Sequence, residues 1–271
     1  MTAPQGCVRF GLVIVGDEIL SGKRQDKHLN KVIELLGARG LQLGWSHYIG
    51  DDRDALVELY GRTFANDDVV ISCGGIGATP DDHTRQAVAV ALDVPLKLDP
   101  QAASLISERC AAMARKGMGS ADMSTPENQQ RLKMGEFPSG AAIIPNPFNR
   151  IPGFSIRNHW FVPGFPVMAW PMIEWLLDKH YAHHFNSHSR AERSLIVFEV
   201  AESLLTPLME EVEQNFPGVR TFSLPSVGDG QDGKPARRHV ELGVRGDASI
   251  VEQAFNDLRA NVLALGAEVS A

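Results

Sequence analysis

The stretch VVISCGGIGATPDDHT, residues 69–84, decides the fold that we expect for this chain. Its first five residues, from Val69 to Cys73, are mostly apolar and predict a short buried strand that runs directly into glycines. A helix is predicted after the loop, from His83 to Leu92. A strand, a glycine-rich loop and a helix in this order are typical of an α/β sheet.

The rest of the first half repeats the alternation of strands and helices. Strands are predicted at residues 8–15 and 41–49, helices at 29–36 and 52–66, an extended segment at 95–98 and a further helix from Asp99 to about Lys116. This alternation favours a mostly parallel sheet with helices on both faces.

The second half predicts the end of this domain and a smaller one. Prolines recur between Pro138 and Pro171, which indicates short strands joined by turns. A helix at 167–181, with Pro171 in its first turn, closes a first domain at residues 1–181, and the polar residues 182–192 are the predicted linker. Strands at 194–200, 220–224 and 239–244, helices at 204–215 and 248–265, and a hairpin at 228–238 then predict a small βαββα domain over residues 193–271.

The composition excludes several classes of protein. With 271 residues, 44% hydrophobic and 22% charged, the chain is expected to be globular. The net charge of −7 and the lack of a basic stripe predict no nucleic-acid partner. We expect no membrane span and a cytoplasmic location, because no long apolar run or secretion signal is evident and the three cysteines are too few for a disulfide framework.

The loop of residues 74–84 carries the chemistry. Its three glycines expose backbone N–H groups, and the start of the next helix adds partial positive charge, so the loop suits a phosphate. Asp81 and Asp82 would repel that phosphate unless a divalent cation bridged them, and Mg²⁺ binds one or two carboxylates together with phosphate oxygens. The pattern therefore indicates a phosphate–metal site. The alternative is a tight turn in which Asp81 or Asp82 caps the next helix.

Two other predicted strands end in similar loops, GDEILSG at residues 16–22 and GDDR at residues 50–53. Capping or turn formation explains each loop taken alone. Together, however, the three loops follow strands whose carboxyl ends share one edge of the sheet, where ligands of open α/β sheets lie. The fingerprints of P-loop kinases, of dinucleotide-binding folds and of serine hydrolases are absent, which disfavours those activities.

Several of these segments resemble the molybdopterin-binding domain family, most closely its branch formed by the N-terminal domain of competence/damage-inducible protein A (CinA). The resemblance is carried in order by VGDEILSG at 15–22, GDD at 50–52, GGIGATPDDHT at 74–84, PNP at 145–147, PGF at 152–154 and VPGFP at 162–166. The C-terminal unit resembles the second domain of that branch. Two departures stand out: Ala78 replaces a usual proline, and Lys27 with His28 replaces a Thr-Asn pair.

The resemblance implies a three-layer αβα domain and a ligand with a phosphate or diphosphate group. It implies a metal-dependent ADP-ribose pyrophosphatase, whereas more distant relatives bind molybdopterin and adenylylate it. Asp51 and Asp82 match carboxylates important in those relatives, and Lys133 matches a basic position that neutralises a second phosphate. The residues expected to contact the ligand and its phosphates are Gly16, Asp17, Glu18, Ser21, Gly74, Gly75, Gly77, Thr79 and Thr84.

The resulting hypothesis is hydrolysis of a nucleoside diphosphate linkage, with ADP-ribose as substrate. A divalent ion, Mg²⁺ or alternatively Mn²⁺ or Co²⁺, would be held by Asp82 with help from Asp51 or Asp81. The amides of residues 75–77 and the Lys133 ammonium would stabilise charge on the diphosphate, so that Asp51, Asp82 and Lys133 are the expected catalytic residues. The alternatives are a pterin- or nucleotide-binding module without turnover, and molybdopterin adenylylation. Self-association into a homo-oligomer is expected through the tryptophan-bearing segments.

Overall fold

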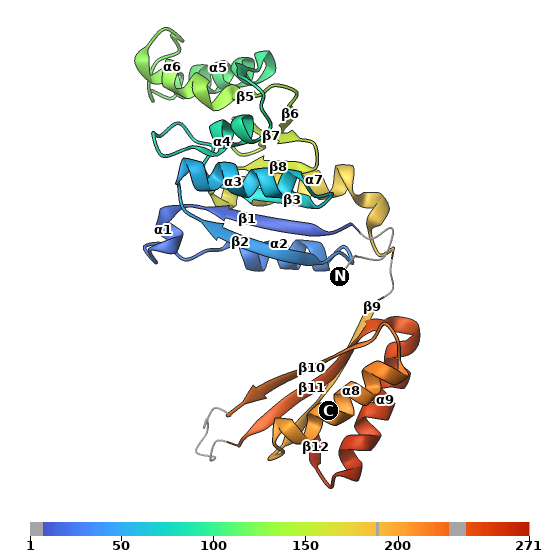
Figure 1. Cartoon of the computed structure of the whole chain (residues 1–271). Coiled ribbons are helices and arrows are strands. Elements are labelled where there is room, and N and C mark those ends of the chain that lie inside the picture. The colour runs from blue at the N-terminus through green and yellow to red at the C-terminus, as the bar shows by residue number, and fades with distance from the viewer. Residues whose placement is uncertain (1–7, 188–189, 228–236, 271) are drawn as a thin grey trace. The chain divides into compact units, whose positions relative to one another are not determined.

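The structure is a computed structural model that describes residues 8–187, 190–227 and 237–270. The chain divides into two compact units, Met1–Phe185 and Asn186–Ala271 (Figure 1). The predicted linker at residues 182–192 is shorter in the structure. A 3-10 turn, η2 (Ala182–His184), follows the first unit, and Phe185 packs against its core. The first strand of the second unit, β9 (Arg190–Phe198), begins inside the predicted linker, because Arg190 pairs with Asp247.

A six-stranded sheet forms the centre of the larger unit. Its order is β2 (Leu43–Ile49), β1 (Phe10–Val15), β3 (Val69–Cys73), β8 (His159–Val162), β7 (Gly153–Ile156) and β6 (Ala142–Ile144). The first four strands are parallel, whereas β7 and β6 are antiparallel to their neighbours. The prediction of a mostly parallel sheet is thus confirmed, and the proline-rich segment supplies the antiparallel edge.

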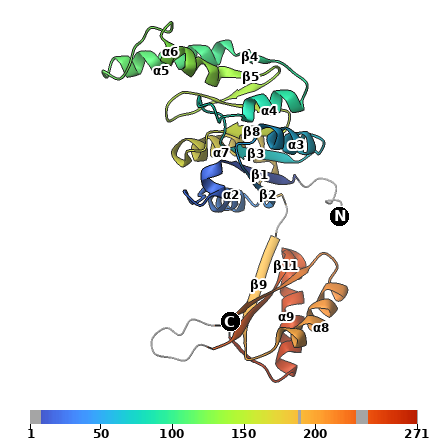
Figure 2. The same ribbon diagram turned by 60° about the vertical axis from the view of Figure 1, so that its left-hand side comes forward.

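Helices cover both faces of this sheet (Figure 2). The β1 residues Phe10, Leu12 and Ile14 belong to one core with α2 (His28–Gly37) and α7 (Pro166–His180). The alternate residues Val13 and Val15 belong to the other core, with α3 (Arg53–Phe64) and α4 (Thr84–Ala91). Successive side chains of a strand point to opposite faces, so an apolar strand is buried on both sides. The expected three-layer αβα arrangement is therefore present.

Two further parts of the larger unit frame the loops described below. A short helix, α1 (Asp17–Leu20), follows β1 directly. A small antiparallel pair, β4 (Leu96–Leu98) and β5 (Glu136–Pro138), carries α5 (Pro100–Ala114), α6 (Pro126–Leu132) and the 3-10 turn η1 (Lys133–Gly135) between its strands. Pro171 is not in the first turn of α7 as predicted. Pro166 occupies the first position of that helix, which places Pro171 in the second turn.

The smaller unit is an antiparallel sheet covered by two helices. The sheet order is β10 (Arg220–Ser226), β11 (His239–Asp247), β9 and β12 (Glu268–Ser270), and its core includes residues of α8 (Glu202–Asn215) and α9 (Ala248–Ala264). The predicted βαββα pattern lacked β12, because this strand has three residues and Val269 alone is apolar. The tip of the predicted hairpin, residues 228–236, lies outside the described residues. In the part of the chain that the structure describes, no helix has the length and apolarity needed to cross a membrane.

Candidate functional site

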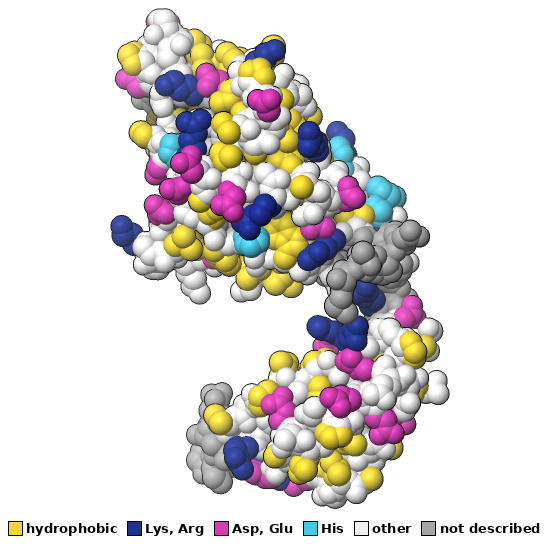
Figure 3. Space-filling view, in the orientation of Figure 1, with side chains coloured by type: hydrophobic (Ala, Val, Ile, Leu, Met, Phe, Trp, Pro, Cys, Tyr) yellow, Lys and Arg dark blue, Asp and Glu magenta, His cyan; other side chains and the backbone are white. Residues whose placement is uncertain are grey.

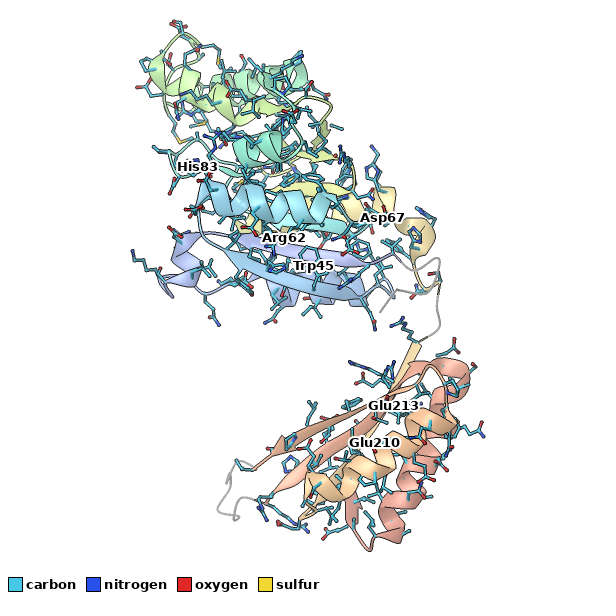
Figure 4. The ribbon with its side chains drawn as sticks, in the orientation of Figure 1. Trp45, Arg62, Asp67, His83, Glu210 and Glu213 are labelled. Atoms are coloured by element: carbon cyan, nitrogen blue, oxygen red, sulfur yellow. The ribbon has the colours of Figure 1, made fainter. Side chains whose placement is uncertain are left out.

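The loops singled out in the sequence meet at one edge of the larger sheet, because β1, β2, β3 and β8 are parallel and end there. In Figure 4 the label of His83, the residue just before α4, marks this edge. Asp67, which lies just before β3, marks the opposite edge of the sheet. In the space-filling view, acidic side chains gather on the same side of the larger unit as α1 (Figure 3). The edge is therefore a meeting point of backbone turns and negative charge.

The loops after β1 and β2 are joined by reciprocal hydrogen bonds. The Asp17 amide donates to Oδ2 of Asp51 over 2.9 Å, and the Asp51 amide donates to Oδ1 of Asp17 over 3.3 Å. The Gly16 amide also donates to the Ile49 carbonyl over 3.0 Å. A Cβ on Gly50 would lie against the Asp17 carboxylate, so a larger residue there would displace this side chain. The two acids that the sequence placed in separate loops are thus neighbours.

The glycine loop after β3 passes directly over the end of β1. Gly74 has a φ of +107° and its Cβ would overlap the Val15 carbonyl oxygen, while Gly75, at φ +67°, would overlap the Thr84 hydroxyl. Both positions need a left-handed backbone as well as free space, which only glycine offers. The Thr84 hydroxyl is buried and donates to the Gly74 carbonyl over 3.2 Å. Thr84 therefore supports the loop from inside instead of facing a ligand as predicted.

Asp82 has a different role from the predicted metal ligand and catalytic acid. Its Oδ1 accepts from the Gly77 amide over 2.8 Å, and its Oδ2 accepts from the Thr79 amide over 2.8 Å and from the Thr79 hydroxyl over 2.5 Å. The carboxylate thus accepts hydrogen bonds from two loop amides, those of Gly77 and Thr79, that were expected to contact a ligand. It does not cap α4, whose N-cap is His83. The structure replaces both sequence interpretations of Asp82 with a third, a support of the loop's shape.

The hydrogen bonding of the edge leaves a smaller set of open amides than the sequence suggested. The amides of Gly16, Gly74, Gly77 and Thr79 donate to Ile49, Val162 and Asp82, and the exposed Ser21 uses its amide for the Asp17 carbonyl. In contrast, the amides of Gly75, Ile76 and Ala78 donate to no group among the described residues. Buried N–H groups require partners, and the inner turns of the loop obtain them from the protein itself. The open amides of the loop are therefore those of Gly75, Ile76 and Ala78.

Arg85 also shapes the loop, and the sequence analysis missed it. Its side chain is 3% exposed, and it donates from Nη1 to the Ile76 carbonyl over 3.1 Å and from Nη2 to the Gly77 carbonyl over 2.6 Å. Burial lowers the pKa of the guanidinium, and the nearby Asp82 and Glu136 oppose that shift. The signal in the sequence was an arginine two positions before the apolar run Ala87–Ala91, in a helix that is largely buried. Arg85 thus holds the carbonyls of Ile76 and Gly77, and the amide that shares a peptide unit with the Gly77 carbonyl, that of Ala78, remains open.

Four acids from three loops share the open side of the edge. Burial raises the pKa of Asp51, the hydrogen bond from the Asp17 amide opposes this, and the charges of Asp17, Glu18 and Asp81 raise the pKa further. Asp81 is fully exposed, and a hydrogen bond from Thr79 lowers its own pKa. The predicted metal set of Asp51, Asp81 and Asp82 does not converge, since the described residues include no group of three potential ligands. The reason is that Asp82 faces the loop amides, which leaves Asp51 and Asp81 as the acids that influence each other.

The segment carrying Lys133 approaches the loop from α6. The Gln130 side-chain amide donates to the Ala78 carbonyl over 2.5 Å, which fixes α6 beside the loop. Lys133 follows three residues later and continues the helical backbone, so it lies on the same side of this segment. Lys133 is exposed and forms no ion pair with the described acids. The structure thus places this lysine near the loop but not against the carboxylates.

The exit of β8 forms the remaining side of the edge. The buried His28 donates from Nε2 to the Gly164 carbonyl over 2.9 Å, since a carbonyl oxygen can only accept. A Cβ built on Gly164 would lie 3.4 Å from the Gly74 Cα, so the two loops are in contact. His28, one of the two departures noted in the sequence, therefore fixes the β8 exit against the glycine loop.

A parallel sheet with helices on both faces, and a preformed glycine loop at its carboxyl edge, define an α/β ligand-binding domain of the doubly wound type. Residues 11–183 match the family model described as "Probable molybdopterin binding domain". The chain belongs to this family, as its motifs predicted.

The relatives agree with this assignment. A "CinA-like protein" of Anaeromyxobacter sp. (strain Fw109-5) is 31% identical over 93% of this chain and 63% of its own length. A "CinA-like protein" of Solibacter usitatus (strain Ellin6076) is 29% identical over 90% of this chain and 56% of its own length. The chain thus spans little more than half to under two thirds of these two relatives. A crystal structure of "the protein CinA with unknown function" from Thermoplasma acidophilum superposes with a TM-score of 0.52 at 24% identity, over 63% of this chain and 97% of that one, and supports the fold.

Proposed function

We propose that the larger unit binds a nucleotide or pterin phosphate at the carboxyl edge of its sheet. The open amides of Gly75, Ile76 and Ala78 would donate to phosphate oxygens, and the start of α4 adds partial positive charge to the same loop. Lys133, beside the loop through Gln130, would neutralise a second phosphate. The family assignment supports a small-molecule ligand of this kind.

We further propose that Asp51 and Asp81 hold a divalent cation together with the ligand's phosphate oxygens. Mg²⁺ commonly binds one or two protein carboxylates and completes its shell with phosphate and water, so two acids without a third ligand suit it. Mn²⁺ and Co²⁺ fit the same donors. When bound, such an ion polarises a phosphoryl oxygen and offsets the repulsion between the acids and the phosphates.

The reaction that this arrangement supports best is hydrolysis of a nucleoside diphosphate linkage, with ADP-ribose as the substrate. One observation carries this proposal: Asp51 is held by the Asp17 amide at 2.9 Å, and burial and three acidic neighbours raise its pKa. The negative charge crowded around Asp51 favours a divalent cation there, and that cation would polarise a phosphoryl oxygen and orient the attacking water. The amides of Gly75 and Ile76 would stabilise the charge that develops on the leaving phosphate.

The test is release of AMP and ribose 5-phosphate from ADP-ribose by the full chain with Mg²⁺, Mn²⁺ or Co²⁺. Asp51→Asn is expected to lower kcat by about 100-fold, because it removes one of the two carboxylates that would hold the cation. Asp54→Asn is the matched control, because Asp54 is exposed on the first turn of α3 and its side chain forms no hydrogen bond or ion pair among the described residues. Equal turnover by the two variants and the wild type would refute the role of Asp51.

A second candidate is a binding module without turnover. It is favoured by the absence of three converging ligands among the described residues and by Asp82 filling part of the loop. In the same assay it predicts binding of AMP or of molybdopterin with no metal-dependent product. Formation of an adenylylated pterin from ATP and molybdopterin would instead indicate the third activity considered for this family.

A further inference from the structure

A large aromatic side chain stands at the open edge beside the glycine loop. Phe165 directly follows Gly164 and is 56% exposed, although it begins the most apolar helix of the larger unit. Its carbonyl accepts from the Met168 amide and from the Ala169 amide, each over 2.9 Å. The bond to Ala169 shows that Phe165 lies one helical turn before a fully buried residue of α7.

Phe165 is the N-cap of α7, with an extended backbone at φ −88° and ψ 120°. The buried residues Ala169, Met172 and Leu176 form the stripe of α7 that packs on the sheet. Because its backbone is not helical, the i, i+4 spacing of that stripe does not apply to the Phe165 side chain. The neighbouring strand β8 ends at Val162, so Phe165 lies beyond the end of the sheet. Its side chain stays more than half exposed there.

The same residue is close to the open amides. A Cβ built on Gly164 lies 3.4 Å from the Gly74 Cα. Adding about 1.5 Å for the Cα–Cβ bond and about 3.8 Å to the next Cα places the Cα atoms of Phe165 and Gly74 at most about 9 Å apart. The Gly74 amide also donates to the Val162 carbonyl over 3.0 Å, and His28 holds the Gly164 carbonyl. The aromatic residue and the glycine loop are thus fixed to one another through short backbone contacts.

We propose that Phe165 is a specificity-determining residue that stacks on the flat heterocycle, a purine or a pterin, of the ligand whose phosphate binds Gly75, Ile76 and Ala78. The inference rests on the proposed function, because it requires a phosphate at those amides. An aromatic ring within reach of a phosphate loop suits a ligand with a π-face at one end and a phosphate at the other. The separation between Phe165 and the loop leaves room for the sugar or linker that joins these two groups.

Two other exposed apolar side chains lie on the same segments and provide controls. Phe148 is 58% exposed in the loop after β6, and Val167 is 54% exposed in the first turn of α7. The loop that carries Phe148 contacts α7 through the side-chain amide of Asn149 and Sδ of Met168, 3.2 Å apart. If Phe165 served self-association instead of ligand binding, these residues would act together with it.

The experiment compares ligands that differ in the heterocycle alone. Binding of AMP and of ribose 5-phosphate to the full chain is measured by calorimetry for the wild type, Phe165→Ala, Phe165→Trp and Phe148→Ala. Stacking predicts that Phe165→Ala weakens AMP binding roughly 5- to 150-fold and leaves ribose 5-phosphate unchanged. Phe165→Trp retains AMP binding, and Phe148→Ala behaves as wild type. A parallel titration with 6-hydroxymethylpterin decides whether a pterin shares the platform.

The other outcomes overturn the inference. Unchanged AMP binding in Phe165→Ala refutes stacking while leaving the phosphate site intact, and an equal loss for both ligands indicates a disturbed loop instead of a platform. A shift in oligomeric state for both Phe165→Ala and Phe148→Ala, measured by light scattering with ligand affinity unchanged, assigns the residue to an interface. If the wild type binds neither phosphate compound, the proposed function itself fails, a result distinct from the first three.

Discussion

Asp81 and Asp82 are adjacent in sequence, yet only the replacement of Asp82 by alanine should lower the stability of the protein. Asp82→Ala removes the acceptor for the Gly77 amide, the Thr79 amide and the Thr79 hydroxyl. Hydrogen bonds to charged groups contribute about 1.5–3 kcal/mol each. Thr79 is exposed and water can replace two of these bonds, so we count the Gly77 bond alone. The expected loss is about 1.5–3 kcal/mol. Asp81→Ala, at a fully exposed position, should leave the stability nearly unchanged.

Thermal unfolding followed by circular dichroism measures this difference. For a unit of 185 residues, 1 kcal/mol corresponds to a Tm change of roughly 2–4 °C, so Asp82→Ala should lower the Tm of the larger unit by about 3–12 °C. Hydrogen exchange at the Gly77 amide should accelerate in the same variant. If Asp81→Ala destabilises the protein as much as Asp82→Ala, or if Asp82→Ala falls within about 0.5 kcal/mol of wild type, Asp82 is not the support of the loop.

Three further variants test the same structural account. Asp51→Asn should stabilise the protein at neutral pH, because the folded protein raises the pKa of Asp51 and so makes its ionisation less favourable than in the unfolded chain. In urea titrations this gain should vanish as the pH falls toward 3.8, where the acid is protonated in both states. A loss of stability at pH 7 would contradict this. His159 is neutral in the folded protein, because burial lowers its pKa from 6.5 to about 3. The free energy of unfolding of the wild type should therefore fall by up to about 5 kcal/mol as the pH falls from 6.5 to 3, and His159→Gln should flatten that dependence. An unchanged dependence in His159→Gln would show that another group dominates the acid transition. Arg85→Met leaves the carbonyls of Ile76 and Gly77 without donors, so it should lower the free energy of unfolding by about 1–3 kcal/mol and weaken AMP binding. The control Arg62→Met, at an exposed position of α3, should change neither quantity. Equal calorimetric affinities of the two variants for AMP would exclude a role of Arg85 in shaping the loop.

The fold was predictable because short apolar runs alternate along the chain with segments whose apolar residues recur at helical spacing. This alternation indicates a sheet whose strands are buried on both faces. The strand Val69–Cys73 and the helix after it occur within one residue of their predicted positions. The extra strand β12 escaped prediction because a three-residue strand has too few residues to show an alternating pattern.

The candidate site was predictable in position but not in its internal roles. That three loops meet at one edge follows from the parallel direction of the strands, which sequence alternation indicates. The sequence does not tell which of the two acids, Asp81 or Asp82, faces the proposed ligand. The two residues are chemically identical, and the direction of each side chain depends on the turn in which Asp82 accepts from the amides of Gly77 and Thr79. Arg85 was missed for a related reason: a buried arginine is recognised by the carbonyls around it, and these come from a loop folded back in space.

Because the Asp82 carboxylate accepts hydrogen bonds from two inward N–H groups, those of Gly77 and Thr79, the glycine loop is held by an anionic side chain of the protein itself. The protein itself therefore holds the turns of the loop, and the proposed phosphate ligand would meet a loop that is already formed. Little chain entropy remains to be lost on association, so the free energy of contact is available for affinity and not for ordering the backbone. A loop of this kind should bind quickly and release its guest with minimal rearrangement of the protein.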